Sequence, residues 1–208
     1  MKAERLDYQK NEGLETGNLL QNPFEQFNLW FGFAVATDAH NANAMALSTI
    51  HNNRPSSRIV LLKELDATGF TFYTNYASAK SKEIGGNKYA ALLFFWKENE
   101  RQIRIEGTLE KVSDNASDEY FKTRPRESQI GAWASPQSET ITREELEKRV
   151  AEFSKKFEGK DVPRPQHWGG FRLVPDRFEF WQGRASRLHD RFVYENKNGK
   201  WEIYRIAP

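Results

Sequence analysis

Short apolar runs with the composition of β-strands follow one another through most of this chain, and they most constrain its fold. Such runs lie at 45–50, 57–65, 70–75, 89–96, 101–112, 169–174, 177–182, 190–195 and 201–206. Asp66 to Gly69 and Asn198-Gly199 are turn signals between neighbouring runs, so these pairs are expected to form hairpins. The regular alternation of strand and helix that builds a doubly wound parallel sheet is missing. We therefore predict a mainly β fold, a closed antiparallel barrel with flanking helices. The run 89–96 is apolar nearly throughout, which predicts burial on both faces.

Helices are expected at four places between these runs. Asn22-Pro23 has the form of an N-cap followed by proline, and apolar residues follow at helical spacing. A short basic helix is expected at 78–84, and two longer helices at 114–123 and 142–157, the last beginning with a Thr-Arg-Glu-Glu capping box. Residues 1–21 are polar and are expected to form a mobile arm, with residues 22–208 as a single domain.

Composition excludes several classes of function. The 31 basic and 29 acidic residues give a net charge of +2, which provides no broad basic surface for nucleic acid. The chain has no cysteine, and its four histidines form no metal-binding motif. No apolar run approaches the roughly 18 residues needed to span a membrane, and the N-terminus lacks a secretory leader, so a cytoplasmic location is expected. Glycine-rich phosphate loops are also missing, so side chains would have to hold any phosphate.

Two phrases place cations at the ends of apolar, strand-like runs. They are Arg-Ile-Val-Leu-Leu-Lys at 58–63 and Phe-Trp-Gln-Gly-Arg-Ala-Ser-Arg-Leu-His-Asp-Arg at 180–191. On a strand, Arg187, His189 and Arg191 would point to one side, where they would repel each other unless an anion lay between them. Solvated surface charges explain the same pattern equally well. The density of cations beside Trp181 nevertheless favours a pocket for a flat, phosphorylated ligand.

Two further groups of residues suit a phosphate. Tyr73-Thr74 and Ser78-Ala79-Lys80 supply hydroxyls and a cation near an expected helix start. Tyr120 and Arg124 are i,i+4 neighbours on one helix face, and Pro125 would bend the chain so that Ser128 reaches the same place. Such a set would form a phosphate cradle with charge-assisted hydrogen bonds, whereas the alternative is a solvated helix end.

These motifs, in this order, resemble the pyridoxine (pyridoxamine) 5′-phosphate oxidase family from about residue 22 to residue 208. The stretches that carry the resemblance are RIVLLK (58–63), FYTN (72–75), ERQ (100–102), YFKTRPRESQIGAW (120–133), WGGFR (168–172), EFWQG (179–183) and RLHDR (187–191). The resemblance implies a split β-barrel homodimer with two FMN sites at the subunit interface. It also implies oxidation of pyridoxamine and pyridoxine 5′-phosphates to pyridoxal 5′-phosphate by dioxygen, with hydrogen peroxide as a product and ammonia released from the amine.

The resemblance also implies roles for individual residues. FMN would contact Arg58, Ile59, Val60, Leu61, Lys63, Tyr73, Thr74, Lys80, Gln102, Gln137, Ser138, Trp181 and Arg191. The substrate phosphate would be held by Lys63, Tyr120, Arg124 and Ser128. Arg187 and His189 would cover the pyridine ring as the catalytic pair, and Arg5 and Tyr8 in the arm would close over the site.

One position departs from the family pattern. The family usually has Ser-Arg-Lys where this chain has Ser78-Ala79-Lys80, so one cation for the FMN phosphate is missing. Two other functions are alternatives: a flavin reductase that uses a nicotinamide on the same barrel, or a non-catalytic carrier of FMN or pyridoxal phosphate. Oxidation of NADPH in place of pyridoxine phosphate would indicate a reductase. The complete Tyr120, Arg124 and Ser128 set argues against a carrier.

Overall fold

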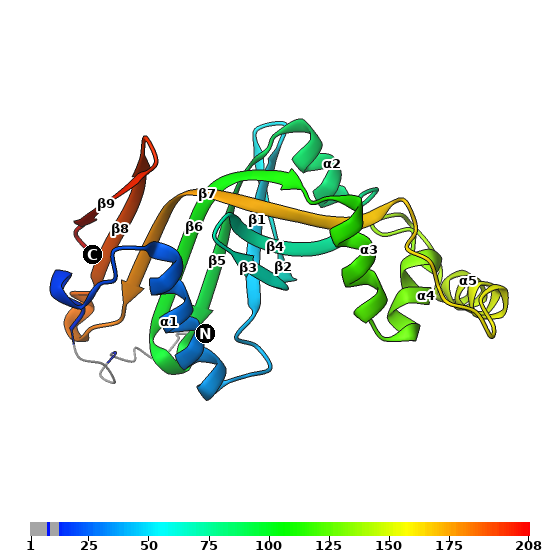
Figure 1. Ribbon diagram of the computed structural model, residues 1–208, viewed down its shortest axis with the longest axis horizontal. Helices are drawn as coiled ribbons and strands as arrows, with labels where there is room; N and C mark the ends of the chain where they lie inside the picture. Colours follow the sequence, from blue (N-terminus) through cyan, green and yellow to red (C-terminus); the bar gives the residue numbers. More distant parts are fainter. Residues whose placement is uncertain (1–7, 9–12) are drawn as a thin grey trace, which may run out of the picture.

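The computed structural model describes residue 8 and residues 13–208, and its strands form one curled antiparallel sheet (Figure 1). Along the sheet the order is β2-β1-β5-β6-β7-β4-β3, and β8 and β9 continue from β7. The strands are β1 (Ala44–His51), β2 (Arg54–Leu61), β3 (Glu64–Asp66), β4 (Gly69–Asn75), β5 (Tyr89–Trp96), β6 (Arg101–Lys111), β7 (Trp168–Gln182), β8 (Asp190–Lys197) and β9 (Lys200–Arg205). The predicted antiparallel β fold with flanking helices is confirmed.

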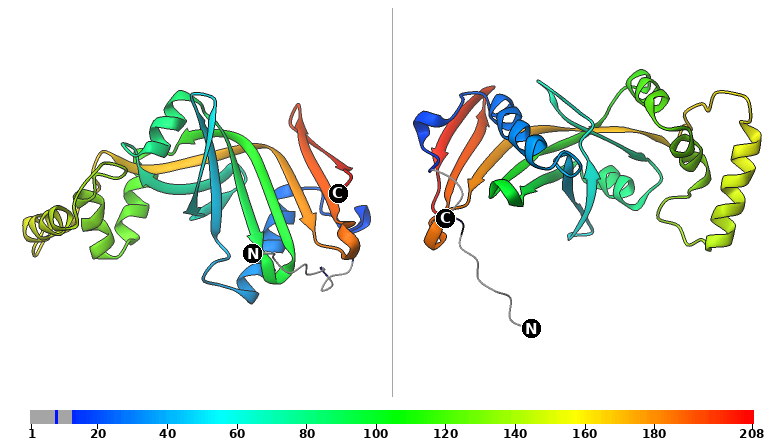
Figure 2. Two further views of the ribbon diagram at one scale, coloured as in Figure 1. Left: turned by 180° about the vertical axis from the view of Figure 1, so that it is seen from behind. Right: turned by 90° about the horizontal axis from the view of Figure 1, so that it is seen from below.

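In the described part of the chain, five α-helices accompany the sheet. They are α1 (Pro23–Thr37), α2 (Ala79–Gly86), α3 (Asp114–Thr123), α4 (Arg126–Ala134) and α5 (Arg143–Lys156). Helix α1 lies near the end of the molecule that carries β8 and β9, whereas α3, α4 and α5 extend from the other end, with α5 outermost (Figures 1 and 2). No helix in the described part of the chain is long and apolar enough to cross a membrane.

Helix α1 forms where the sequence predicts it and supplies part of the core. The Asn22 side chain caps it by accepting a hydrogen bond from the Phe24 amide at 2.9 Å, and Pro23 occupies its first turn. Phe27 is fully buried against Phe70 and Phe94 of the sheet. Burial of an aromatic side chain of this size contributes about 2–3 kcal/mol, so this contact fixes α1 on the sheet.

The strands bury alternate residues, as a half-exposed sheet requires. In β5, Leu92 and Phe94 are buried in the core, while Tyr89 and Phe95 on the other face are exposed. The prediction that this run is buried on both faces is therefore wrong for the single chain, which buries only one face of β5. Its outer face is apolar but uncovered by the described residues.

Two strand boundaries and one helix differ from the sequence prediction. The run 57–65 is split, because β2 pairs with β1 at one edge of the sheet and β3 pairs with β4 at the other. The runs 169–174 and 177–182 form one strand, β7, and its register with β6 shifts where Asp176 has no partner between Arg177, opposite Glu106, and Pro175, opposite Gly107. Helix α4 was not predicted; it begins directly after Pro125, the same residue that ends α3.

Other local predictions are confirmed. Thr142 and Glu145 form the predicted capping box at the start of α5. The Asn198-Gly199 turn joins β8 to β9. The division into an arm and a domain at residue 22 stays a prediction, although Leu14 and Leu19, within the predicted arm, are buried.

Candidate functional site

A cavity of about 550 Å³ brings together residues from β2, β4, α2 and α3. Its lining includes most of the residues predicted to hold a cofactor and part of the predicted phosphate cradle. The lining residues are Ser56, Arg58, Ile59, Val60, Leu61, Lys63, Tyr73, Thr74, Ala79, Lys80, Glu83, Tyr120, Arg124, Gln137, Ser138 and Trp168. The sequence motifs that contribute to this cavity are up to about 110 residues apart along the chain, and the sheet places them together.

At the end of the cavity next to α2, Lys80 donates its hydrogen bonds to neutral groups. Its Nζ donates to Thr74 Oγ1 at 3.1 Å and to Gln137 Oε1 at 3.3 Å. Burial lowers the pKa of Lys80, and the nearby Arg58 charge lowers it further. The first amide of α2, that of Ala79, donates to the Ser138 hydroxyl at 3.2 Å. A helix start, a partly buried ammonium and a hydroxyl together favour an anion at this end.

Arg58, which enters the cavity from β2, is held by several acceptors. Its Nη2 contacts Glu83 Oε2 of α2 at 2.6 Å, and its Nη1 contacts Thr49 Oγ1 at 2.6 Å. Burial by itself would raise the pKa of Glu83, but the hydrogen bonds from Thr49 and Arg58 and the Arg58 charge lower it below its usual value. Glu83 is therefore a carboxylate in a cavity whose other charged lining residues are lysines and arginines.

A stack of aromatic rings forms one wall of the cavity. The Tyr73 ring lies 3.9 Å from that of Tyr120 and 5.5 Å from that of Trp168, in nearly parallel planes. The Arg124 guanidinium covers Trp168 at 4.5 Å from the ring centroid. Burial lowers the pKa of Arg124, and its Nη1 is buried without a hydrogen-bond partner in the described part of the chain. An unpaired buried donor of this kind marks a place where an acceptor from a ligand fits.

The corner between α3 and α4 brings the predicted phosphate residues together. Tyr120 lies in α3, Arg124 caps the end of that helix with an extended backbone, and Ser128 lies in the first turns of α4. A second cavity, of about 340 Å³, is lined by Arg124 and Ser128 and shares Tyr73 with the first. Pro125 causes the bend between the helices, as predicted, because it cannot continue α3.

The other predicted site residues lie elsewhere in the chain. Gln102, Trp181 and Arg191 are side by side on β6, β7 and β8, as the strand register shows. The His189 ring lies 4.6 Å from that of Trp181, and the Tyr8 ring lies 5.4 Å from Trp181. None of these residues lines either cavity described above. β8 lies at one end of the molecule, whereas α2 and α3 lie toward the other (Figure 1). Arg5 lies outside the described residues.

The predicted strand through Arg187, His189 and Arg191 is wrong. Arg187 belongs to a short turn, Ala185–Arg187, and β8 begins only at Asp190. Ser186 and Arg187 have φ values of 56° and 62°, in the left-handed region, so the backbone cannot extend there. The three cations consequently do not share one strand face.

The turn fixes the chemistry of His189. The Arg184 amide donates to His189 Nδ1 at 3.1 Å. Burial lowers the pKa of His189, and the Arg187 charge lowers it further, while Asp190 opposes this shift. A neutral imidazole that accepts through Nδ1 carries its proton on Nε2, so His189 can donate a hydrogen bond from Nε2.

Arg191 is paired within its own chain. Its Nε and Nη2 donate to Glu179 Oε1 at 2.9 and 2.7 Å, and its Nη1 donates to the Ala207 carbonyl. Glu179 is almost completely buried, so this pair fixes the end of β8 against β7.

Three lining residues were missed from the sequence: Ser56, Glu83 and Trp168. Glu83 follows Lys80 by three residues in a helix, a spacing that places both on one face, but the spacing alone does not show what the face contacts. Trp168 begins the WGGFR stretch that carries part of the family resemblance, but only the tertiary structure shows its contact with Arg124.

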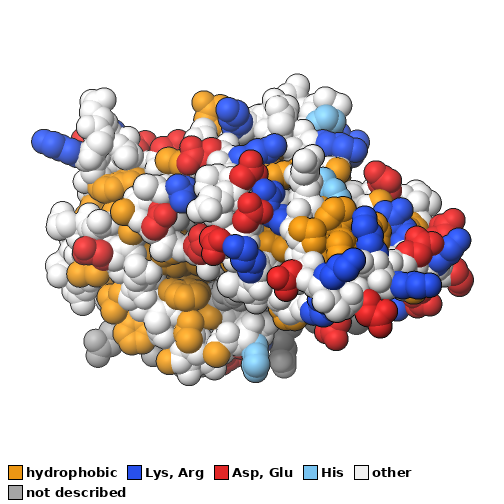
Figure 3. All heavy atoms as spheres, turned by 45° about the vertical axis from the view of Figure 1, so that its right-hand side comes forward, with side chains coloured by type: hydrophobic (Ala, Val, Ile, Leu, Met, Phe, Trp, Pro, Cys, Tyr) orange, Lys and Arg blue, Asp and Glu red, His pale blue; other side chains and the backbone are white. Residues whose placement is uncertain are grey.

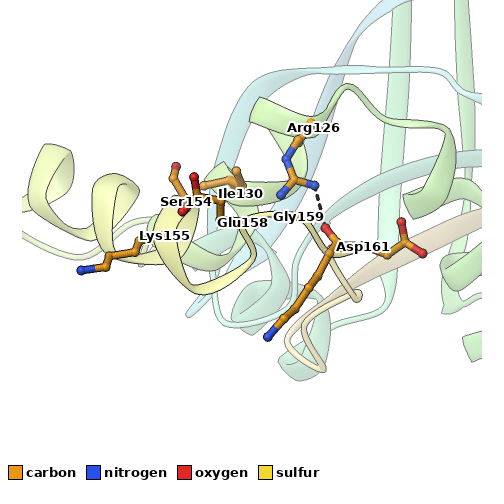
Figure 4. Close-up of a pocket in the computed structure, with 8 residues that line it drawn as sticks. Arg126, Ile130, Ser154, Lys155, Glu158, Gly159 and Asp161 are labelled. Atoms are coloured by element: carbon orange, nitrogen blue, oxygen red, sulfur yellow. Dashed lines mark hydrogen bonds between the residues drawn. The ribbon is translucent and has the colours of Figure 1, made fainter.

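A larger hollow of about 910 Å³ lies between α4 and the end of α5 (Figure 4). Arg126 spans it and donates to the carbonyls of Lys160 at 2.9 Å and Phe157 at 2.5 Å, which satisfies acceptors after the end of α5. Its wall has no aromatic ring, and its charges are of both signs, so we assign it a structural role.

Lys and Arg are interspersed with Asp and Glu over the face in Figure 3. In the described part of the chain, no cluster of His, Asp and Glu could hold a metal ion.

Comparison with known proteins gives a consistent result. A family model described as pyridoxamine 5′-phosphate oxidase matches residues 34–157, and one described as the pyridoxine 5′-phosphate oxidase C-terminal dimerisation region matches residues 168–208. Proteins named pyridoxine/pyridoxamine 5′-phosphate oxidase are similar to almost the whole chain. The one from Nostoc punctiforme is 52% identical, over 98% of this chain and 96% of its own length. The one from Bordetella pertussis is 53% identical, over 98% and 97%.

Solved structures show the same fold. PhzG from Burkholderia lata, in complex with tetrahydrophenazine-1-carboxylic acid, has a TM-score of 0.87 at 29% identity and covers 92% of this chain and 95% of its own. An FMN-binding protein from Nostoc punctiforme, related to pyridoxamine 5′-phosphate oxidase, has a TM-score of 0.69 at 18% identity over 88% and 97%.

Proposed function

This chain belongs to the pyridoxamine 5′-phosphate oxidase family of flavoproteins, and we propose that its flavin is FMN, held in the 550 Å³ cavity next to α2. The enzyme oxidises pyridoxamine 5′-phosphate and pyridoxine 5′-phosphate to pyridoxal 5′-phosphate, a reaction of vitamin B6 biosynthesis. Dioxygen is the acceptor and leaves as hydrogen peroxide, and the amine substrate releases ammonia. The observation that carries the assignment to this cavity is the grouping of the predicted FMN residues Arg58 to Leu61, Tyr73, Thr74, Lys80, Gln137 and Ser138 on its walls.

The residues present fit the phosphate of FMN. Lys80 has hydrogen bonds to neutral acceptors, so its charge is available to an anion. Arg58 adds a second cation, and the Ser138 hydroxyl, which accepts from the first amide of α2, adds a donor. The backbone of Ile59 to Leu61 provides an edge along which a flat ring system can lie.

The substrate phosphate has a separate place. Arg124, with its unpaired buried Nη1, lies between the two cavities, with Tyr120 and Lys63 in one and Ser128 in the other. A guanidinium and two hydroxyls make charge-assisted hydrogen bonds to a phosphate, which fixes the substrate in position and orientation.

A homodimer completes the site in this proposal. Trp181, Arg187, His189 and Arg191 lie away from the cavity in their own chain, and all fall within the C-terminal dimerisation region, residues 168–208. On the outer face of the sheet, Ile59 is 67% and Phe95 51% exposed, and both are apolar side chains that a second copy would cover. We infer that the second copy brings these four residues, with Gln102, over the flavin and the substrate ring.

Each residue then has a task in the reaction. When bound, FMN supplies hydride acceptance and reoxidation by dioxygen. The Tyr120, Arg124 and Ser128 set holds the phosphate end of the substrate. His189, neutral near pH 7, donates from Nε2 toward the C4′ substituent, and Arg187 supplies a positive charge beside it. Tyr8, which packs on Trp181 and His189, covers this group from the arm.

A visible spectrum tests the proposal. The protein reconstituted with FMN is expected to show flavin absorption and to bleach when pyridoxine 5′-phosphate is added without oxygen. Bleaching with NADPH and not with the B6 phosphates would instead indicate a flavin reductase. A bound flavin that stays oxidised with both B6 phosphates would contradict the proposed site.

A further inference from the structure

The end of the cavity next to α2 contains an unexpected negative charge. Among the lining residues, Glu83 is the only carboxylate. Its Oε2 accepts hydrogen bonds from Arg58 Nη2 at 2.6 Å and from Thr49 Oγ1 at 2.5 Å, and its side chain is only 14% exposed. A partly buried carboxylate in contact with a cation of the phosphate site affects how that site binds an anion.

The local charges do not balance a phosphate. Arg58 and Lys80 supply two positive charges at this end and Glu83 removes one, which leaves a net charge of about +1 against a phosphate monoester of about −1.5 to −2. Ala79, the first residue of α2, contributes no cation. Arg58 is also occupied, because both of its terminal nitrogens already have acceptors in the described structure.

We propose that Glu83 competes with the FMN phosphate for Arg58 and so weakens the binding of phosphorylated flavin by this chain. This inference rests on the proposed FMN site. A phosphate at the start of α2 must either share Arg58 with Glu83 or displace it, and in both cases two anions lie close together. Glu83 thus acts as a positioning residue that holds Arg58 in place before FMN binds, at a cost in FMN affinity.

The competition couples FMN binding to proton uptake. The phosphate lies against Glu83 and raises its pKa relative to the free protein, where Thr49 and Arg58 lower it. The charged and titratable groups around Glu83 are Arg58 on β2, Lys80 on its own helix and His51 on β1. Glu83 therefore weakens FMN binding fully at pH values above its raised pKa. The effect declines as the pH falls through that pKa, because Glu83 then takes up a proton.

Glu83→Gln tests the proposal, because the amide oxygen of glutamine still accepts from Arg58 and Thr49 while the charge is lost. FMN and riboflavin are titrated into the apoprotein at pH 5 to 8.5, with flavin fluorescence quenching as the readout. Glu83→Gln is expected to tighten FMN binding by about five- to tenfold at pH 8, with a smaller gain near pH 5, because screened charges at this distance interact modestly. Riboflavin, which lacks the phosphate, is expected to bind both proteins equally.

Two controls make the result specific. Glu147→Gln on α5 removes the same charge from an exposed helical pair and is expected to leave FMN affinity unchanged. Calorimetry in buffers of different ionisation enthalpy is expected to show greater proton uptake for the original protein than for Glu83→Gln. A folded Glu83→Gln protein that binds FMN equally or more weakly would overturn the proposal. Failure of the original protein to bind either flavin would overturn the FMN site itself.

Discussion

The guanidinium of Arg124 lies over the indole of Trp168, 4.5 Å from the ring centroid, with Nη1 buried and without a partner in the described structure. The aromatic surface orients the cation, and the end of α3 places it between two cavities. An arginine held by stacking keeps its hydrogen-bond donors free for a ligand.

Arg124→Ala is expected to raise KM for pyridoxine 5′-phosphate about ten- to a hundredfold. The lost charge-assisted contact is worth about 1.5–3 kcal/mol. FMN affinity is expected to change little, since Arg124 serves the other phosphate. Steady-state kinetics and flavin titration measure both quantities. Lys122→Ala removes an exposed cation two residues away and serves as the control. An unchanged KM would remove Arg124 from the cradle.

Mixed dimers test whether two chains build each site. Arg124→Ala and His189→Ala are each expected to reduce kcat/KM while leaving a folded, yellow protein. If the phosphate residues and His189 of one site come from different chains, unfolding and refolding an equal mixture restores one intact site in each mixed dimer. About a quarter of the original sites should then be recovered, by random pairing of two chains. Activity no higher than the average of the two variants would place both residues in one chain.

Removal of Arg187 is expected to raise the pKa of His189. Burial lowers that pKa most, and the Arg187 charge lowers it further. In Arg187→Ala only burial still lowers the pKa, while the Asp190 charge continues to raise it. The imidazole would then become protonated at a higher pH, and the lower limb of the kcat/KM profile would move in the same direction. Proton NMR titration of His189 measures the shift. Lys197→Ala, at the far end of β8, is the control. If this variant shifted the pKa of His189 as much as Arg187→Ala does, the effect of Arg187 would not be local.

Ala79→Arg is expected to tighten FMN binding by about 1 kcal/mol, because an exposed arginine at the start of α2 can reach the phosphate but must be ordered there. The gain is expected to shrink at high salt. Fluorescence quenching by the apoprotein measures it. An unchanged or weaker affinity at low salt would show that another group, such as Lys82, already supplies this charge, and Lys82→Ala would then weaken binding.

Gly170→Ala is expected to destabilise the protein by about 1–3 kcal/mol, as overpacking does. A Cβ at Gly170 would lie 2.7 Å from Val112 Cγ2 and 2.9 Å from Tyr73 Cε1, so it would displace a ring that lines the cavity. Denaturant unfolding measures the stability, and flavin titration measures the effect on Tyr73. Gly85→Ala in α2 meets nothing within 4 Å and is expected to be neutral or stabilising. Equal behaviour of the two variants would contradict the packing argument.

Local signals in the sequence were sufficient for much of the fold. The Asn22-Pro23 start of α1, the Thr142 capping box and the Asn198-Gly199 hairpin turn each depend on a few neighbouring residues, so the sequence specifies them directly. The same holds for the Pro125 corner, whose geometry follows from the ring of proline. Motif order was also sufficient to identify the family and most of the residues that line the cavity.

Only the tertiary structure decided how distant segments meet. The sequence does not show that β2 and β3 pair at opposite edges of the sheet, because strand register depends on packing against partners far along the chain. The contact of Glu83 with Arg58, and the left-handed turn that takes Arg187 off a strand, depend on the same long-range packing. The sequence of β5 is apolar nearly throughout, so it does not show whether its second face is covered within the same chain. The structure leaves one apolar face uncovered, and that is the face we assign to the second copy.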